Sequence, residues 1–137
     1  MLNNLPARAD VPKDLDAYYY QRAEESKDED LIGALADYTK AIKLNPHHAI
    51  YYMGRAEMKI KLRDLQGAIA DYTKAIELEP SIPELYYLRA GVKMKKKDLR
   101  GSLADYAMAI KINPNDASFY FGRSFLKQYE IKNLQGA

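Results

Sequence analysis

The sequence has no cysteine and no tryptophan, and its only two histidines, His47 and His48, are adjacent. The lack of cysteine excludes a disulfide framework, a thiolate zinc site and a cysteine nucleophile. A serine–histidine–aspartate triad would have to use this histidine pair, and a histidine metal site would need at least one further ligand. We therefore expect no catalytic residue, no metal and no cofactor, and a chain that is not an enzyme.

Long apolar runs and a strong excess of one charge are also missing. No run approaches the roughly 20 apolar residues that a membrane helix needs, and no signal peptide is visible at the N-terminus. The net charge is only +2, which is too small to indicate nucleic-acid binding. We expect no membrane insertion and no nucleic-acid partner. A cytoplasmic location is the default, although a secreted protein with a trimmed signal would look the same.

What the chain does contain is typical of a folded domain with an unusual aromatic bias. Hydrophobic residues make up 47% and charged residues 29% of the 137 positions, and tyrosine occurs twelve times. The charge is unevenly spread, because residues 1–48 carry 6 basic and 9 acidic side chains whereas residues 49–137 carry 15 and 10. The composition predicts one small globular domain.

The sequence repeats itself with a period of 34 residues. The stretch Gly33–Pro46 matches Gly67–Pro80 at 11 of 14 positions and Gly101–Pro114 at 10 of 14. A second block recurs before each of these stretches, with a tyrosine three residues ahead of an arginine. The spacing between the two blocks varies by one residue, which places a turn there.

Each block has the periodicity of an amphipathic helix, and no segment alternates like a strand. We expect seven helices at about 15–28, 31–44, 48–61, 65–79, 82–96, 99–112 and 116–131. Asp30, Asp64, Asp98 and Asn133 are the expected N-caps of second helices. A serine three residues before Glu84 has the spacing of a capping box.

These features resemble the tetratricopeptide repeat family. The run Tyr52…Gly54-Arg55-Ala56…Gly67-Ala68…Asp71-Tyr72…Ala75…Pro80 carries the family pattern of aromatic, small and terminal proline positions over 34 residues. The resemblance implies an all-α fold, an α-solenoid of antiparallel helix pairs in a right-handed superhelix. We expect a tail over 1–13 and a repeat domain over 14–137, with repeats at about 14–46, 47–80 and 81–114 and a partial repeat, a C-terminal helix, at 115–137.

The residues that recur in every repeat are interpreted as structural. Alanines of the first helices should meet small residues of the second helices, with Tyr38, Tyr72 and Tyr106 packed beside them. The recurrent arginine and aspartate should form an ion pair within each repeat. Catalysis is implausible for three identical pairs in one small chain. The expected pairs are Arg22–Asp37, Arg55–Asp71 and Arg89–Asp105.

Function is expected on the inner face, which the first helices line in this family and where a partner peptide or helix usually binds. Each repeat has equivalent positions, here called slots, that face this groove. Their residues are largely apolar and aromatic, which predicts that the partner segment is hydrophobic. Neighbouring first helices could instead bury these side chains against each other. The candidate groove residues are Tyr20, Met53, Glu57, Ile60, Tyr87, Leu88, Met94, Phe121 and Phe125.

One binding mode of the family is not expected. Co-chaperones of the family hold the C-terminal carboxylate of Hsp70 or Hsp90 with a clamp of lysine, asparagine and arginine. The corresponding positions of this chain, in either of the two possible alignments, hold none of the clamp residues. In the first alignment these positions are Tyr20, Glu24, Gly54, Glu84 and Leu88.

The charged turns and the C-terminal end of the repeat domain suggest an alternative to the binding of a partner peptide. The acidic cluster of residues 24–30 and the basic run of residues 93–100 lie at equivalent turns of different repeats, which favours head-to-tail association. The final Leu134-Gln135-Gly136-Ala137 aligns with the start of a second helix. The last first helix would then expose an apolar face. Self-association into a homo-oligomer through this helix and the groove is the alternative function.

Overall fold

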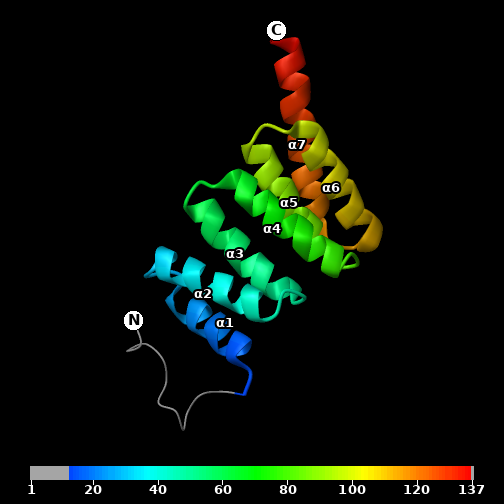
Figure 1. Cartoon of the computed structure of the whole chain (residues 1–137). Helices are drawn as coiled ribbons and strands as arrows, with labels where there is room; N and C mark the ends of the chain where they lie inside the picture. Colours follow the sequence, from blue (N-terminus) through cyan, green and yellow to red (C-terminus); the bar gives the residue numbers. More distant parts are fainter. Residues whose placement is uncertain (1–12, 137) are drawn as a thin grey trace.

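The computed structural model describes residues 13–136, and this part of the chain is entirely helical (Figure 1). Residues 1–12 of the expected tail and Ala137 lie outside the described residues. The prediction of seven helices and no strand is confirmed for residues 13–136. The helices are α1 (Leu15–Ser26), α2 (Leu31–Leu44), α3 (Ala49–Lys61), α4 (Leu65–Leu78), α5 (Pro83–Lys95), α6 (Leu99–Ile112) and α7 (Ala117–Gln135).

The helices form a stack in which each packs mainly on its neighbours in the sequence. α1 pairs with α2, α3 with α4 and α5 with α6, and each pair rests on the next through a second helix and the following first helix. α7 packs on α6 and projects past the rest of the stack (Figure 1). This arrangement is the predicted α-solenoid of antiparallel helix pairs.

Each second helix is capped by an aspartate. The carboxylates of Asp30, Asp64 and Asp98 accept hydrogen bonds of 2.9–3.0 Å from the backbone NH three residues later. Asp64 also donates its own NH to the carbonyl of Lys59, which closes the end of α3. One residue thus ends the first helix and begins the second, which makes the hairpin tight.

Small residues allow the paired helices to approach closely. Ala23, Ala56 and Ala90 of the first helices are fully buried, as are their counterparts on the second helices. The tyrosines of the second helices, Tyr38, Tyr72 and Tyr106, are buried as expected. The counterparts are Ala34, Ala68 and Ser102.

The three expected ion pairs are confirmed. Each arginine donates two hydrogen bonds of 2.7–2.9 Å to the carboxylate of its own repeat, a bidentate geometry. Two of the aspartates also bind a second cation that was not predicted from the sequence. Lys59 contacts Asp71 at 3.0 Å, and Lys93 contacts Asp105 at 3.1 Å. Lys93 is therefore engaged inside its repeat and is not part of an exposed basic run.

Two predicted caps are wrong. α5 begins at Pro83 with Ile82 as its N-cap, and no side chain caps it. Proline suits the first helical position because its φ is fixed and it has no NH, so the helix starts there and the capping box of Ser81 and Glu84 does not form.

Asn133 is the second wrong cap, because it lies inside α7. Neither glycine nor proline interrupts the chain between Arg123 and Gln135. The helix therefore continues for 19 residues, where α3 and α5 have 13. Leu134 and Gln135 end this first-type helix and do not begin a second one.

Candidate functional site

The first helices line an open cleft of about 530 Å³. Most of its walls come from α3, with contributions from α1, α5 and the tyrosine of α4. Five of the nine predicted groove residues lie in it. The lining residues are Tyr20, Glu24, Ile50, Met53, Gly54, Glu57, Ile60, Tyr72 and Leu88.

The helical period explains why α3 supplies so much of the cleft. Ile50, Met53, Glu57 and Ile60 follow one another at steps of three and four residues, so their side chains share one face of the helix. The opposite side of α3 carries Tyr51 and Met58, which are buried in the stack. The same amphipathic pattern therefore builds the core and leaves a second apolar face toward the cleft.

Gly54 forms part of the cleft because a neighbouring ring needs its space. A Cβ atom at this position would lie 2.3 Å from Cε1 of Tyr38. One repeat later the same slot holds Leu88, which lines the cleft together with Tyr72. The change from glycine to leucine thus adds an apolar side chain to the cleft at the start of the third repeat.

The acidic side of the cleft is an ordered network. Glu24 accepts a hydrogen bond of 2.5 Å from the hydroxyl of Tyr38 and pairs with Lys27 at 3.0 Å. Glu57 contacts the same lysine at a longer distance of 3.7 Å, and Lys61 at 4.0 Å. Lys61 lies closer to Asp28, at 3.1 Å. Glu57 is thus the less tightly held of the two cleft carboxylates.

The tyrosines around the cleft stay neutral well into the alkaline range. Burial, helped by the negative charges of Glu57 and Asp71, raises the pKa of Tyr72 to about 12. Burial and the hydrogen bond to Glu24 raise the pKa of Tyr38 as well. Both effects come from low solvation and a local excess of negative charge.

The remaining predicted groove residues lie elsewhere. The ring of Tyr87 lies 5.8 Å from that of Tyr106 and 5.3 Å from that of Phe119, between its own second helix and the next first helix. Met94 is half-buried near the end of α5 and outside the cleft lining. Phe121 and Phe125 are exposed on α7.

Tyr20 packs against neighbouring rings and also lines the cleft. The predicted aromatic groove residues therefore do not form one continuous groove. Its ring packs on Tyr38 and Tyr51, with centroids 6.0 and 5.2 Å apart, while its edge lines the cleft. Tyr87 makes the equivalent contacts two repeats along the stack, with Tyr106 and Phe119. The alternative of mutual burial therefore describes Tyr87, and describes Tyr20 in part.

A second hollow of about 450 Å³ lies on α7 and is lined by Phe125, Gln128, Tyr129, Ile131 and Lys132. It is separate from the cleft, so Phe125 belongs to a different surface from the one expected.

Four lining residues were absent from the predicted groove set: Glu24, Ile50, Gly54 and Tyr72. The slot of Ile50 holds Ala17, Glu84 and Ser118 in the other repeats. A single isoleucine in a slot that is otherwise small or polar is a signal that could have been used. Tyr72 carried no such signal, because the same tyrosine recurs in every repeat for packing.

Between residues 13 and 136, no group of three or more histidine, cysteine, aspartate or glutamate side chains is placed to hold a metal ion. None of the seven helices is both long enough and apolar enough to span a membrane.

Comparison with known proteins identifies the fold. The tetratricopeptide repeat family model matches residues 27–76 and 59–117. No curated protein matches the sequence.

Solved structures share the fold at low sequence identity. The Arabidopsis OM64 TPR domain has 24% identity and a TM-score of 0.77, covering 83% of this chain and 95% of that one. The first TPR domain of human RPAP3 has 18% identity and a TM-score of 0.80, covering 89% and 97%. The first TPR of Spaghetti, bound to the HSP90 peptide SRMEEVD, has 19% identity and a TM-score of 0.79, covering 85% and 93%.

The matched repeats, the 34-residue period and the helix pairs agree with one another. The chain belongs to the tetratricopeptide repeat family, whose domains serve as scaffolds for protein–protein interaction.

Proposed function

We propose that this protein is an interaction scaffold that binds a peptide or helix of a partner protein in the cleft of α1, α3 and α5. The observation that carries the proposal is an apolar surface left open by the fold. Ile50 and Leu88 are 40% and 36% exposed and both line the cleft, with Met53 and Ile60 half-buried beside them. Apolar area that the fold leaves in water favours association with a partner that buries it.

The cleft also suits a binding role because its walls are firmly held. Glu24 is fixed by Tyr38 and Lys27, and Gly54 lies directly on the ring of Tyr38. A preformed site loses little side-chain freedom when a ligand binds, so more of the contact energy appears as affinity. Methionine at position 53 adds a side chain that adapts to irregular ligands.

The proposal excludes a carboxylate clamp. The Spaghetti domain is bound to the HSP90 peptide SRMEEVD, which ends in acidic residues and a carboxylate. In this chain the cleft is lined by two carboxylates, Glu24 and Glu57, and by no lysine or arginine. A ligand of that charge would be repelled at close range.

The test is selection of displayed peptides on the whole chain, followed by affinity measurement on variants. The double variant Ile50→Ser, Leu88→Ser should weaken the selected peptides by at least about tenfold, since two apolar contacts are lost. Ile32→Ser is the matched control, because Ile32 is 65% exposed on α2 and outside the cleft. Equal affinity for the double variant and the control, both folded by circular dichroism, would refute binding in the cleft.

A second candidate is self-association through α7. Tyr52 of α3 and Tyr86 of α5 are buried, whereas the equivalent Tyr120 of α7 is 37% exposed. Ile131 and Leu134, in the part of α7 that is longer than α3 and α5, are exposed as well. No carboxylate lies within ion-pair distance of Arg123 among the residues of the described chain. An antiparallel α7 of a second copy would offer apolar cover and Glu130, the single acidic residue of that helix.

Sedimentation as a function of concentration tests this candidate. Self-association should disappear in Ile131→Asp and persist in the cleft variant Ile50→Ser, Leu88→Ser. Monomer at all concentrations and at low as well as high salt would exclude it.

A further inference from the structure

We infer that the cleft selects a partner segment that carries a lysine or arginine flanked by apolar side chains, with the cation placed on Glu57. The inference rests on the proposed function and adds the chemistry of the ligand. It is carried by the unequal use of the carboxylates in and beside the cleft.

The two cations beside the cleft are committed to other carboxylates. Lys27 lies 3.0 Å from Glu24 and 3.7 Å from Glu57. Lys61 lies 3.1 Å from Asp28 and 4.0 Å from Glu57. Each lysine therefore forms its short ion pair with a carboxylate other than Glu57. The two contacts left to Glu57 are long, at or near the limit of direct contact.

Glu57 is also accessible. Its side chain is 45% exposed, compared with 33% for Glu24, whose other oxygen is occupied by the hydroxyl of Tyr38. A ligand cation can thus reach Glu57 without breaking a short hydrogen bond. The buried Asp71, by contrast, is already paired with both Arg55 and Lys59.

The apolar contacts lie on either side of this carboxylate. Met53 is one turn before Glu57 on α3, and Ile60 is about one turn after it, on the same face. Leu88 reaches the cleft from α5. A ligand with a cation between apolar side chains would match this order. A uniformly apolar segment would cover Glu57 and leave it only its two long lysine contacts, at a cost in free energy.

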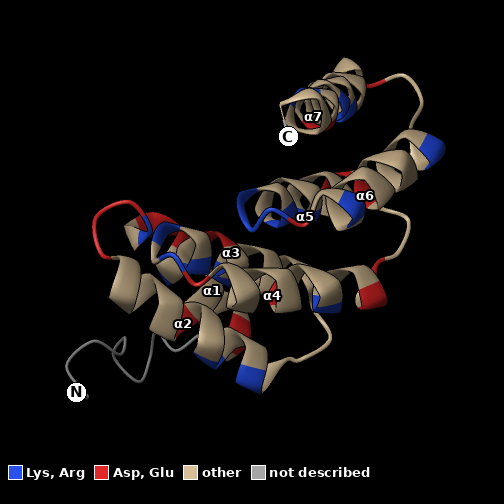
Figure 2. Cartoon of the chain, turned by 90° about the horizontal axis from the view of Figure 1, so that it is seen from above, with Lys and Arg blue, Asp and Glu red and all other residues tan. Residues whose placement is uncertain are grey.

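The wider field favours the same ligand. Acidic residues gather at the turn between α1 and α2, next to the cleft, and basic residues gather at the turn between α5 and α6 (Figure 2). In the slot of Glu57 the later repeats hold Gly91 and Phe125. The carboxylates that line the cleft are therefore confined to its α1 and α3 end, and a cation at that end of the ligand also fixes its direction.

The experiment compares three fluorescent helical peptides of one length on the whole chain: a leucine–lysine peptide, a leucine–glutamate peptide and a serine–lysine peptide. We expect the leucine–lysine peptide to bind most tightly. Glu57→Gln should weaken this peptide by roughly two- to fivefold, the range of an exposed ion pair. Glu57→Lys should shift the preference toward the leucine–glutamate peptide.

Two controls separate the cleft from the general acidic surface. Glu77→Gln removes an exposed carboxylate on α4, and Glu29→Gln removes one at the α1–α2 turn; both should leave the affinity of the leucine–lysine peptide unchanged. A loss in Glu29→Gln equal to that in Glu57→Gln would overturn the assignment to Glu57.

The remaining outcomes distinguish the inference from the proposed function. Equal or tighter binding of the leucine–glutamate peptide to the wild type overturns the cation preference and leaves an apolar cleft. Binding of the serine–lysine peptide as tightly as the leucine–lysine peptide overturns both, because the attraction would then be charge alone. Absence of binding by all three peptides also overturns both.

Discussion

The helices α5 and α7 occupy the same place in successive repeats, yet they have different surroundings. Tyr86 of α5 is 6% exposed, and its hydroxyl donates a hydrogen bond of 2.8 Å to the carbonyl of Pro80. Tyr120, one period later, is 37% exposed. The neighbouring small residue is fully buried in α5, where it is Ala90, and exposed in α7, where it is Ser124.

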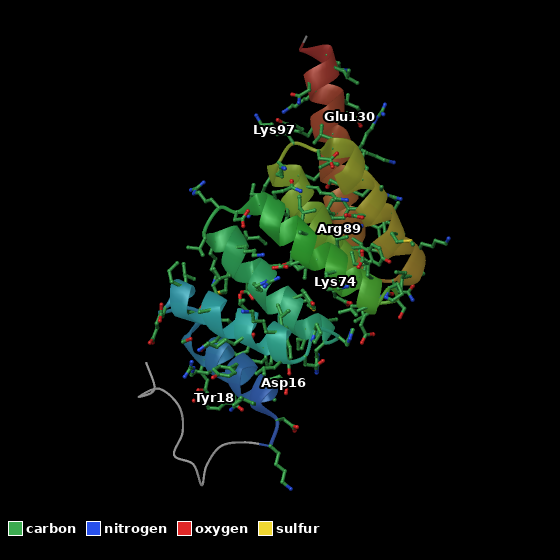
Figure 3. All side chains as sticks on the ribbon, viewed as in Figure 1. Asp16, Tyr18, Lys74, Arg89, Lys97 and Glu130 are labelled. Carbon is green, nitrogen blue, oxygen red and sulfur yellow. The ribbon has the colours of Figure 1, made fainter. Side chains whose placement is uncertain are left out.

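The arginines of the two helices show the same contrast. Arg89 lies within the stack (Figure 3), where it holds Asp105 in two hydrogen bonds and donates a third to Thr73 of the preceding repeat. Arg123 lies only over the ring of Tyr120, at 5.3 Å. In a repeat stack, burial and pairing are properties of the neighbours more than of the residue itself.

The largest expected difference is between the two tyrosines. Tyr86→Ala should lower the free energy of unfolding by about 3–5 kcal/mol, because it leaves a cavity between α5 and α6 and removes a buried hydrogen bond. Tyr120→Ala should cost less than about 1 kcal/mol. Denaturant unfolding measures both, and equal losses would show that α7 is covered in solution.

The next difference is between the two arginines. Arg89→Ala leaves the buried carboxylate of Asp105 with Lys93 alone, and should cost about 1.5–3 kcal/mol. Arg123→Ala should change the stability by less than about 0.5 kcal/mol. A double-mutant cycle with Asp105→Asn checks the assignment, and additivity of Arg89→Ala with that change would contradict the pairing.

A third contrast separates two glycines of the first helices. Gly54→Ala drives a methyl group into the ring of Tyr38 and should destabilise the fold by about 1–3 kcal/mol. A Cβ atom on Gly91 meets nothing within 4 Å. Gly91→Ala should therefore stabilise the protein by about 0.5–1 kcal/mol through helix propensity alone, and thermal melting of the two variants measures the opposite signs.

The smallest expected change in stability concerns the turns that follow α3 and α5, where α7 instead continues as helix. Arg63 and Lys97 follow the ends of α3 and α5 and have φ values of 64° and 65°, which are unfavourable for a residue with a side chain. Lys97→Gly should raise the stability by up to about 1 kcal/mol. The change lies at the exposed α5–α6 turn (Figure 3), and a lower melting temperature would mean that the side chain of Lys97 contributes a contact that outweighs the strain.

Much of the fold was predictable because every repeat restates the same requirements. The caps at Asp30, Asp64 and Asp98, the small residues of the helix contacts and the three ion pairs were all read from the period. The wrong predictions fall where the repeats differ. Pro83 moves the start of α5, and the absence of a breaker lets α7 continue through Asn133.

The candidate site was less predictable, since exposure in a slot depends on which helix lies across from it. Met53, Glu57, Ile60 and Leu88 were predicted as groove residues from their helix positions, and the structure gathers them with Tyr20 in one cleft. Tyr87 occupies the slot of Met53 but is taken up by Tyr106 and Phe119. Position within the repeat could not by itself distinguish Met53, which lines the cleft, from Tyr87, which packs against other rings.

The sequence by itself determined the helix pairs, their order and their internal contacts, because those depend on residues within one period of each other. The tertiary structure decided which apolar side chains remain open. The deciding contacts join different repeats, as when Tyr38 fills the space beside Gly54 and Lys61 lies closer to Asp28 than to Glu57. Such contacts depend on how repeats stack, and a pattern within one repeat does not encode them.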